Sequence, residues 1–323
     1  MTGPHRPTLA EIGAARERLA PHVVRTPLVP LDVGLPDRKI FLKLETLQPI
    51  GAFKLRPALN ALLSRDRAAL AAGVAVASSG NMAYGMAAAA RMLGVPMAAY
   101  MVSGAPKTKI EGVQRLGGAV RFISMETWWR TIVEAERPDA PELLINPVTD
   151  QAVLAGNGTI GLEIVEDLPD VDVVVTPYGD GSLTTGVASA VKALRPQATV
   201  LAAEDENAAP VTAALAAGGD IVEIATRPSF VKSIGGPSLV PQLWPVARDL
   251  IDGATAVSLG QITEAMRLLF SKAKVVAEGA GAASLAAALT DERAKGNVVC
   301  VISGGNIDAD AFATVLAGGI PNP

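Results

Sequence analysis

The sequence predicts an α/β fold with two lobes, in which open, twisted parallel sheets carry helices on both faces. Apolar runs such as Val171–Pro177 and Asn297–Ser303 alternate with alanine-rich helical stretches from about Lys39 onwards. Strands that are apolar throughout are buried on both faces, which is typical of parallel sheets joined by helical crossovers. The length of 323 residues exceeds the usual single-domain range, so one large or two medium domains are expected.

The individual elements follow from the spacing of the apolar residues. Continuous apolar runs predict strands at Lys39–Glu45, Val74–Ser78, Met97–Val102, Ala119–Ile123, Val171–Pro177, Thr199–Glu204 and Asn297–Ser303. Apolar residues that recur every three or four positions predict helices at Met82–Leu93, Lys107–Leu116, Leu183–Leu194 and Gly281–Leu289. Thr8 and Glu11 form a capping-box pattern, which predicts an N-terminal helix that ends near Leu19.

Composition excludes several classes of function. Half of the residues are hydrophobic (50%) and 19% are charged, which favours a packed core over a disordered chain. The net charge of -4, without a basic stripe, gives no support for a nucleic-acid partner. His5 and His22 lie near the N-terminus in unrelated contexts, so a histidine triad or a zinc site is not expected.

The expected compartment is the cytoplasm. Cys300 is the single cysteine, which excludes an intrachain disulfide and fits a reducing environment. The apolar runs are far shorter than a membrane span, and Met1–Pro7 lacks the layout of a signal peptide. No contact with a membrane is therefore expected.

Lys54 is the most informative candidate residue. It follows the predicted strand Lys39–Glu45 and opens a helical pattern that starts at Leu55. The helix dipole and partial burial would disfavour its ammonium form, and the neutral amine is the form that makes a Schiff base. For a lysine considered alone, the commoner interpretation is a surface side chain whose stem covers apolar neighbours.

Further loops at predicted strand ends carry small polar residues, and ligands of open parallel sheets bind at such ends. Ser78–Asn81 offers hydroxyls, an amide and N–H groups to an anion, although such residues also serve as ordinary helix caps. The glycines of Gly179–Ser182 would let the backbone approach a phosphate. A dinucleotide site is the competing interpretation of this loop, because Glu204 ends the next strand, but the glycine spacing departs from that motif. Ser303–Asn306 could present a hydroxyl to a heteroaromatic nitrogen, or be a glycine-rich turn.

Taken in this order, the motifs resemble those of the fold-type II pyridoxal-phosphate enzymes, most of all the threonine/serine dehydratase (ammonia-lyase) and serine racemase branch. The motif around the lysine is Leu44–Pro49 running into Gly51–Lys54. Further matches are Arg25–Leu28, Ser78–Asn81, Glu278–Ala282 and Ser303–Asn306. The resemblance covers nearly the whole chain and implies the tryptophan synthase beta-like fold. It also implies a large cofactor-binding domain at 1–68 and 150–323, and a small, mobile substrate-binding domain at 69–149.

The resemblance implies pyridoxal 5'-phosphate as the cofactor and assigns roles to the matching residues. Lys54 would hold the cofactor as a Schiff base and act as the catalytic acid/base, with Ser79 as a second candidate. The cofactor-binding residues would be Phe53, Lys54, Asn81, Gly179, Asp180, Gly181, Ser182, Leu183 and Ser303. The amino-acid substrate would be bound by Ser78, Ser79, Gly80, Asn81 and Met82.

The implied activity is an ammonia-lyase that converts a β-hydroxy amino acid, such as threonine or serine, to a 2-oxo acid and ammonia. Ala52 and Met82 stand where dehydratases have more polar residues, which predicts a substrate bulkier or less polar than serine. A racemase that uses Ser79 and a β-replacement synthase are the alternatives within the family, and Phe53–Arg56 favours the dehydratase over the synthase. An NAD-binding oxidoreductase is the alternative from a different class. The expected assembly is a homodimer.

The cation site of this branch is matched only in part. Glu204 and the carbonyl of Ala208 match protein ligands of that site, whereas Pro210 stands where an aspartate is expected. Loss of a carboxylate weakens a site for a hard cation. No bound metal is therefore predicted, and Glu204 and Ala208 are weak candidates.

Overall fold

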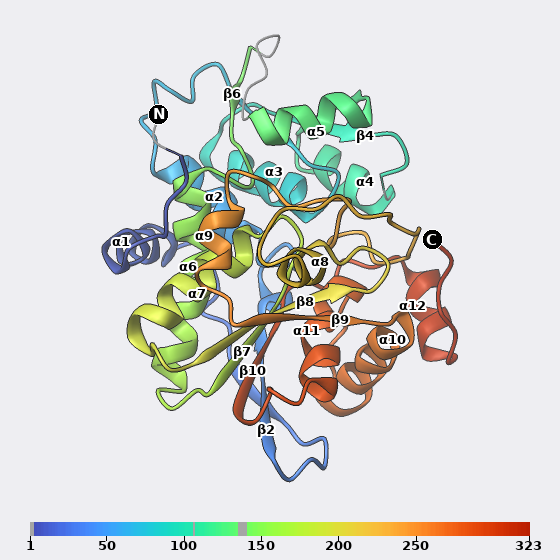
Figure 1. Cartoon of the computed structure of the whole chain (residues 1–323). Helices are drawn as coiled ribbons and strands as arrows, with labels where there is room; N and C mark the ends of the chain where they lie inside the picture. Colours follow the sequence, from blue (N-terminus) through green and yellow to red (C-terminus); the bar gives the residue numbers. More distant parts are fainter. Residues whose placement is uncertain (1–2, 106, 135–140) are drawn as a thin grey trace.

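A computed structural model describes residues 3–105, 107–134 and 141–323 of the chain (Figure 1). The strands form a 6-stranded sheet and a separate 4-stranded sheet. In Figure 1 the larger sheet occupies the lower part of the molecule, and the smaller sheet and its helices lie above it.

The larger sheet has the strand order β1-β2-β10-β7-β8-β9. Its strands are β1 (Leu28–Leu31), β2 (Arg38–Leu44), β7 (Val173–Pro177), β8 (Thr199–Asp205), β9 (Gly253–Val257) and β10 (Gly296–Ile302). Neighbouring strands run parallel, except that β1 pairs antiparallel with β2 at the edge. The register aligns Ile302 with Leu44 and Cys300 with Val175. The loops that follow β2, β7 and β10 therefore leave the sheet at one edge.

The smaller sheet is parallel throughout and has the order β5-β4-β3-β6. Its strands are β3 (Val74–Ala77), β4 (Met97–Val102), β5 (Ala119–Ile123) and β6 (Leu143–Leu144). The proposed small domain, 69–149, contains all of these strands, and its boundaries stay a prediction.

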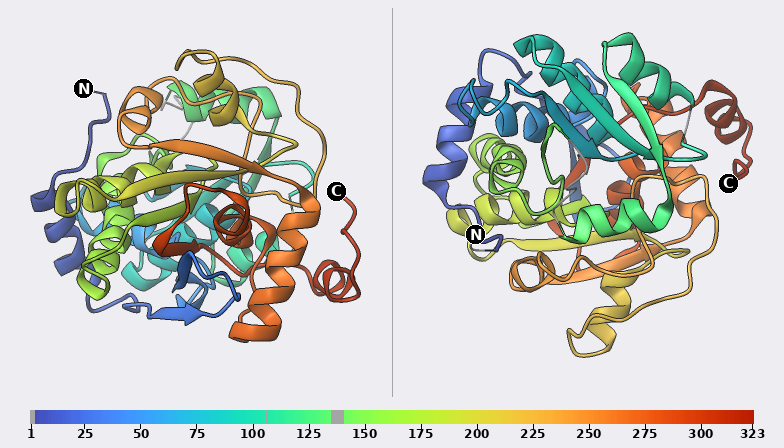
Figure 2. Two further views of the ribbon diagram at one scale, coloured as in Figure 1. Left: turned by 60° about the horizontal axis from the view of Figure 1, so that its bottom comes forward. Right: turned by 90° about the horizontal axis from the view of Figure 1, so that it is seen from above.

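Helices cover both faces of each sheet (Figure 2). On the larger sheet, α6 (Gln151–Asp167), α7 (Ser182–Leu194), α8 (Pro210–Ala216) and α9 (Trp244–Arg248) pack on one face. The other face is covered by α10 (Leu259–Leu268), α11 (Gly279–Thr290) and α12 (Ala309–Leu316). A π-helical turn, Leu269–Ala273, extends α10, and a 3-10 turn, Glu45–Leu47, follows β2. On the smaller sheet, α2 (Leu55–Leu63), α3 (Asn81–Leu93) and α4 (Lys107–Arg115) lie opposite α5 (Met125–Glu134).

Alternate residues of a buried strand serve opposite cores. In β10, Val298, Cys300 and Ile302 pack with α10 to α12. Val299 and Val301 belong to the core of the opposite face, with α6 and α7. Because both faces are covered, the strand needs no polar alternation, which accounts for the apolar runs in the sequence.

The predicted α/β class with parallel sheets is confirmed. The predicted strands and helices are present, with ends that differ by at most two residues, and the capping box of Thr8 and Glu11 starts α1 (Leu9–Leu19). The strands β1, β6 and β9 were not predicted. Trp128 and Trp129, on α5, pack partly buried against the smaller sheet. Within the described ranges, no helix has the length and apolar character needed to cross a membrane.

Candidate active site

Lys54 lies directly before the first residue of α2. Its side chain is 12% exposed, and its Nζ lies 3.3 Å from Oδ2 of Asp180. The same nitrogen lies 4.7 Å from the ring centroid of Phe53, within the range of a cation–π contact. The candidate lysine is therefore largely buried and faces the loop that follows β7.

The backbone around Lys54 is packed tightly between α3 and the end of β10. A Cβ atom on Gly85 would lie 2.6 Å from the carbonyl oxygen of Lys54, so this approach requires glycine. On the other side, the backbone N–H of Phe53 donates a hydrogen bond of 2.9 Å to the carbonyl of Ser303. Two of the predicted motifs, the lysine turn and the Ser303 loop, are thus joined directly.

The loop Gly179–Ser182 connects β7 to α7. Gly181 has a φ of 88°, and a Cβ atom there would lie 2.6 Å from Oη of Tyr178, so the turn requires glycine. Oδ1 of Asp180 accepts hydrogen bonds from the backbone N–H of Ser182 (2.8 Å) and from its hydroxyl (2.6 Å). The Asp180 carboxylate therefore occupies the start of α7, where unpaired N–H groups and the helix dipole favour an anion.

Ser233 lies between the predicted anion-binding loops. A Cβ atom on Gly179 would lie 2.8 Å from the carbonyl oxygen of Ser233, and one on Gly80 would lie 4.0 Å from its hydroxyl. Leu183, which is 5% exposed, belongs to the same apolar cluster as Phe53. The structure thus brings together the lysine turn, the loop after β7 and the start of α3.

The hydroxyls of the loop before α3 bond to nearby backbone. Oγ of Ser79 accepts a hydrogen bond of 2.9 Å from the N–H of Val102, at the end of β4. Oγ of Ser78 accepts one of 3.2 Å from the N–H of Gly80. Met82 is only 3% exposed and packs in the apolar core of the smaller sheet. A contact of Met82 with a substrate therefore stays a prediction, and its burial leaves little surface for one.

A chain of polar contacts links the smaller sheet to the larger one through Asn81. Its Nδ2 donates a 2.5 Å hydrogen bond to Oε1 of Glu278, whose other oxygen lies 3.2 Å from Nζ of Lys109. Lys109 also donates to the hydroxyl of Ser233 at 3.2 Å. On the other side of the amide, Oδ1 of Asn81 accepts a 2.9 Å hydrogen bond from Nδ2 of Asn306.

Lys109, Glu278 and Ser233 had no assigned role from the sequence. Glu278 begins the motif Glu278–Ala282, which is a signal that could have identified it. Lys109 looks like an ordinary helix-surface lysine in the sequence, yet its side chain is 5% exposed. Its partners Ser233 and Glu278 lie 124 and 169 positions away in the chain, so local spacing holds no signal for it.

Glu204 and Ala208, the weak metal candidates, both face protein atoms. The Glu204 carboxylate accepts hydrogen bonds of 2.8 Å from the N–H of Val211 and from the N–H and hydroxyl of Thr212. Glu204 thereby caps the N-terminus of α8. Burial raises the pKa of Glu204 despite these bonds. A Cβ atom on Gly235 would lie 2.4 Å from the carbonyl oxygen of Ala208. In the part of the chain that the structure describes, no cluster of three or more His, Cys, Asp or Glu side chains could hold a metal ion.

A buried ionic network fixes the first turn of α2, directly after Lys54. Arg56 is 1% exposed, and its guanidinium lies 2.9 Å from Glu45 and 2.7 Å from Glu163. Nζ of Lys43 lies 2.6 Å from Glu163. Burial opposes the charge of Arg56, but Glu45 and Glu163 raise the pKa of Arg56 above its usual value. Burial also opposes the charge of Glu163, but Arg56 and Lys43 lower the pKa of Glu163. At Lys43 burial outweighs its carboxylate partner Glu163 and lowers the pKa. The network therefore pairs two basic side chains, Lys43 and Arg56, with two buried carboxylates, Glu45 and Glu163.

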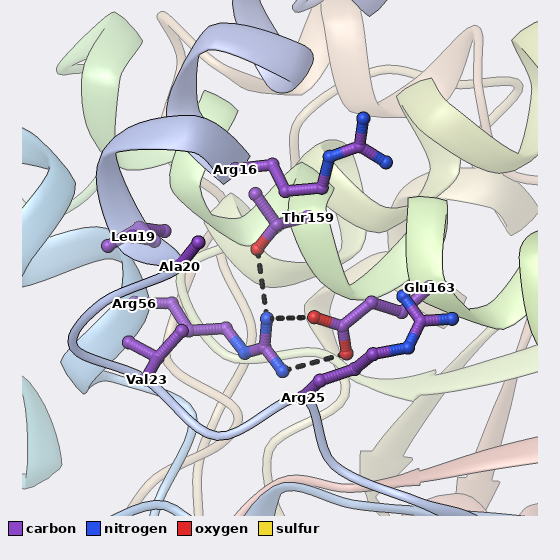
Figure 3. A pocket seen from close by; sticks show the side chains of 8 residues that line it. All are labelled: Arg16, Leu19, Ala20, Val23, Arg25, Arg56, Thr159 and Glu163. Atoms are coloured by element: carbon purple, nitrogen blue, oxygen red, sulfur yellow. Dashed lines mark hydrogen bonds and ion pairs between the residues drawn. The ribbon is translucent and has the colours of Figure 1, made fainter.

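A cavity of about 220 Å³ lies beside this network (Figure 3). It is lined by Arg16, Leu19, Ala20, Val23, Arg25, Arg56, Thr159 and Glu163. In Figure 3 the guanidinium of Arg56 is joined to Thr159 and Glu163, so protein atoms already engage its N–H groups. The cavity therefore lies next to the ionic network that supports α2, and Arg56 and Glu163 belong to both.

These residues fit a phosphorylated pyridoxal group in most respects. A largely buried amine, Lys54, faces a glycine turn at a helix start, which suits covalent attachment together with phosphate binding. Ser303, 5% exposed at the end of β10, supplies a neutral hydroxyl. The exception is Asp180, whose carboxylate lies in the position that suits the phosphate.

Comparisons with known proteins give the same family as these residues. The sequence model of the family "Pyridoxal-phosphate dependent enzyme" matches residues 19–304. The chain is 34% identical to serine racemase of Arabidopsis thaliana over 93% of each protein. It is 36% identical to L-threonine ammonia-lyase of Thermotoga maritima, over 97% of this chain and 79% of that protein. The structure of maize serine racemase matches with a TM-score of 0.86 at 32% identity, covering 97% of this chain and 98% of the maize chain.

These matches decide against an NAD-binding oxidoreductase, and the binding of a phosphate by Gly179–Ser182 stays a prediction. The dinucleotide-binding alternative is wrong. It required the carboxylate of Glu204 to bind a ribose, but this carboxylate instead accepts a hydrogen bond from Val211 at the start of α8. The cofactor of the matched family is pyridoxal phosphate. The chain belongs to the pyridoxal-phosphate dependent enzymes of fold type II, in the branch of the threonine ammonia-lyases and serine racemases.

Proposed function

We propose that this chain is an ammonia-lyase that converts a β-hydroxy amino acid to a 2-oxo acid and ammonia. Its relatives include both lyases and racemases, so the choice must come from the site. The observation that supports the lyase concerns Ser79, the candidate second base, whose Oγ accepts a 2.9 Å hydrogen bond from the N–H of Val102. A hydroxyl that already accepts a hydrogen bond is a weaker base, which disfavours proton transfer on the second face of the substrate.

Lys54 would hold the cofactor through Nζ and would then remove the α-proton of the substrate. When bound, pyridoxal phosphate supplies the electron sink for the carbon that loses this proton. Only a neutral amine can accept this proton. Nζ lies 3.3 Å from Oδ2 of Asp180, so attachment of the cofactor would have to break this ion pair first. Ser303 would give the ring nitrogen a neutral partner, which favours prompt departure of the β-hydroxyl.

The N–H groups and side chains of Ser78–Asn81, at the start of α3, would bind the carboxylate of the substrate. The side chain of Asn81 is already oriented by Glu278 and Asn306, so it can position a ligand without a large loss of conformational freedom. Ala52 and Met82 are apolar and 0% and 3% exposed. Because both side chains are buried, the proposal of a substrate bulkier or less polar than serine rests on their positions in the family motifs and not on an exposed contact surface.

An assay of 2-oxo acid and ammonia over a panel of β-hydroxy amino acids tests this function. L-threonine, L-serine and L-phenylserine are compared at equal concentration, and inversion of each is followed by chiral chromatography. We expect elimination to exceed inversion and kcat/KM for threonine or phenylserine to exceed that for serine. Equal or better turnover of serine would contradict the substrate class, and inversion faster than elimination would contradict the lyase.

A racemase is the second candidate, because serine racemases are among the relatives and the hydroxyl of Ser79 can still donate its proton. The Ser79→Ala variant separates the two candidates when the rate of inversion is compared with the rate of elimination. In a lyase, the ratio of inversion to elimination changes little, whereas in a racemase that uses Ser79 it collapses. A β-replacement synthase would instead require a second nucleophilic substrate for turnover.

We also propose a homodimer in the cytoplasm, with 69–149 as a small domain that moves relative to 1–68 and 150–323. Light scattering of the purified chain tests the dimer, with a mass of twice 33.1 kDa expected. Protection of 69–149 from hydrogen exchange on addition of substrate tests the domain.

A further inference from the structure

The loop that would receive the cofactor's phosphate already contains a carboxylate. Oδ1 of Asp180 accepts hydrogen bonds from the N–H (2.8 Å) and the hydroxyl (2.6 Å) of Ser182, the first residue of α7. Oδ2 of the same carboxylate lies 3.3 Å from Nζ of Lys54. The side chain of Asp180 therefore occupies the anion position at the helix start and also pairs with the amine that would hold the cofactor.

We propose that Asp180 is an internal competitor for the phosphate of the cofactor. Its carboxylate accepts a hydrogen bond from the N–H of Ser182 and pairs with Lys54, and a bound phosphate would displace it from both. The side chain of Asp180 is 30% exposed, so it can turn towards solvent when the phosphate enters. The proposal rests on the proposed function only in placing the cofactor at Lys54 and Gly179–Leu183.

The charges of the loop support competition over joint binding. A phosphate and a carboxylate that share one helix start repel each other, and within a few ångströms near a surface this repulsion exceeds about ten-fold in a binding constant. Tyr178, whose hydroxyl lies against Gly181, offers no positive charge. Burial, followed by the negative charges of Glu204 and Asp180, raises the pKa of Tyr178, so it stays a neutral phenol.

Affinity for pyridoxal phosphate, measured on the full-length protein after removal of the cofactor, tests the proposal. The Asp180→Asn variant removes the charge and keeps an Oδ1 acceptor for the N–H of Ser182. We expect its dissociation constant for pyridoxal phosphate to be at least about ten-fold lower than that of the wild type. We also expect millimolar inorganic phosphate to raise the melting temperature of Asp180→Asn and not that of the wild type. A dissociation constant equal to or higher than that of the wild type would overturn the proposal.

Pyridoxal, which lacks the phosphate, separates competition from a general change in the fold. The gain in Asp180→Asn should be confined to pyridoxal phosphate, and an equal gain for pyridoxal would contradict competition. Asp150 provides the matched control, because its Oδ1 caps α6 through the N–H of Ala152 (2.9 Å) and its other oxygen pairs with Arg65. Asp150→Asn should leave the dissociation constant unchanged. Asp180→Gly is the second variant if Asp180→Asn does not fold, with the same expected direction.

Failure of this proposal is distinguishable from failure of the site. If Lys54→Ala still holds the cofactor covalently, the placement of the cofactor is wrong. If Lys54→Ala loses the covalent cofactor and Asp180→Asn has the affinity of the wild type, only the role of Asp180 is wrong.

Discussion

Asn306 donates a hydrogen bond of 2.9 Å from Nδ2 to Oδ1 of Asn81, although the two residues lie 225 positions apart. The same Nδ2 donates to the carbonyl of Ile50, also at 2.9 Å. One amide thus joins the loop after β10, the start of α3 and the turn that leads to Lys54. The site is assembled by contacts between loops that only the fold brings together.

Loss of this amide should weaken the protein measurably. Asn306→Ala removes both hydrogen bonds and should lower the free energy of unfolding by about 1–2 kcal/mol, as measured by urea denaturation. Asn297→Ala is the control, because its Nδ2 donates a 2.9 Å hydrogen bond to Asp170 on the exposed surface. The control should lose less than about 0.5 kcal/mol. Equal losses in the two variants would show that Asn306 does not tie the loops together.

The sequence predicted the convergence of the site because parallel strands present their carboxyl ends at one edge. This placed the motifs that follow β2, β7 and β10 close together before any contact was known. It did not reveal Lys109, whose partner Glu278 lies at the start of α11 and 169 positions away, because local spacing cannot indicate such a contact. The strand Gly253–Val257 escaped prediction because glycine and alanine give a weak strand signal. Leu28–Leu31 escaped because Pro30 is tolerated only at an edge strand.

The buried network under α2 should be costly to break. Glu163→Gln leaves Lys43 and Arg56 with a single buried carboxylate, Glu45, and should lower the free energy of unfolding by about 3–5 kcal/mol. Glu166→Gln is the matched control on the same helix, because Glu166 pairs with Arg16 and Arg25 at the exposed surface. The control should lose no more than about 1 kcal/mol. Urea denaturation of the two variants gives the comparison, and a loss below about 1 kcal/mol in Glu163→Gln would contradict the network's role.

Asp291 should make stability depend on pH in the acidic range. Burial alone would raise its pKa, but hydrogen bonds from Arg293 and Thr255 lower the pKa of Asp291 from 3.8 to about 2. Because the folded-state pKa is depressed, the stabilisation is present above about pH 4 and is lost as the pH falls towards 2. Arg293 is half exposed, so the effect is about 1–2 kcal/mol.

The Asp291→Asn variant tests this pH dependence. At pH 6 it should be less stable than the wild type by that amount in urea denaturation. The difference should shrink between about pH 4 and pH 3, where the wild-type carboxylate begins to lose its ionised form in the unfolded chain. A difference that stays constant over this interval would mean that ionisation of Asp291 is not its source.

Removal of divalent cations should leave activity almost unchanged. Both oxygens of the Glu204 carboxylate already accept hydrogen bonds from Val211 and Thr212, so protein groups occupy the positions that a cation would need. Pro210 adds no carboxylate. Dialysis against EDTA, followed by assay with and without added Mg²⁺ or Ca²⁺, should change kcat/KM by less than about two-fold. A loss of ten-fold or more that Mg²⁺ restores would establish a cation site that these residues do not explain.

The absorbance spectrum of the purified full-length protein tests the role of Lys54 most directly. A cofactor bound covalently to a lysine absorbs at roughly 410–420 nm. The wild type should show this band, and Lys54→Ala should lack it even after addition of excess pyridoxal phosphate. The control is Lys192→Ala, because Lys192, on α7, pairs with Asp252 at 2.7 Å and should not affect the spectrum. A wild-type protein that never shows the band, or a Lys54→Ala variant that shows it unchanged, would contradict the central role of Lys54.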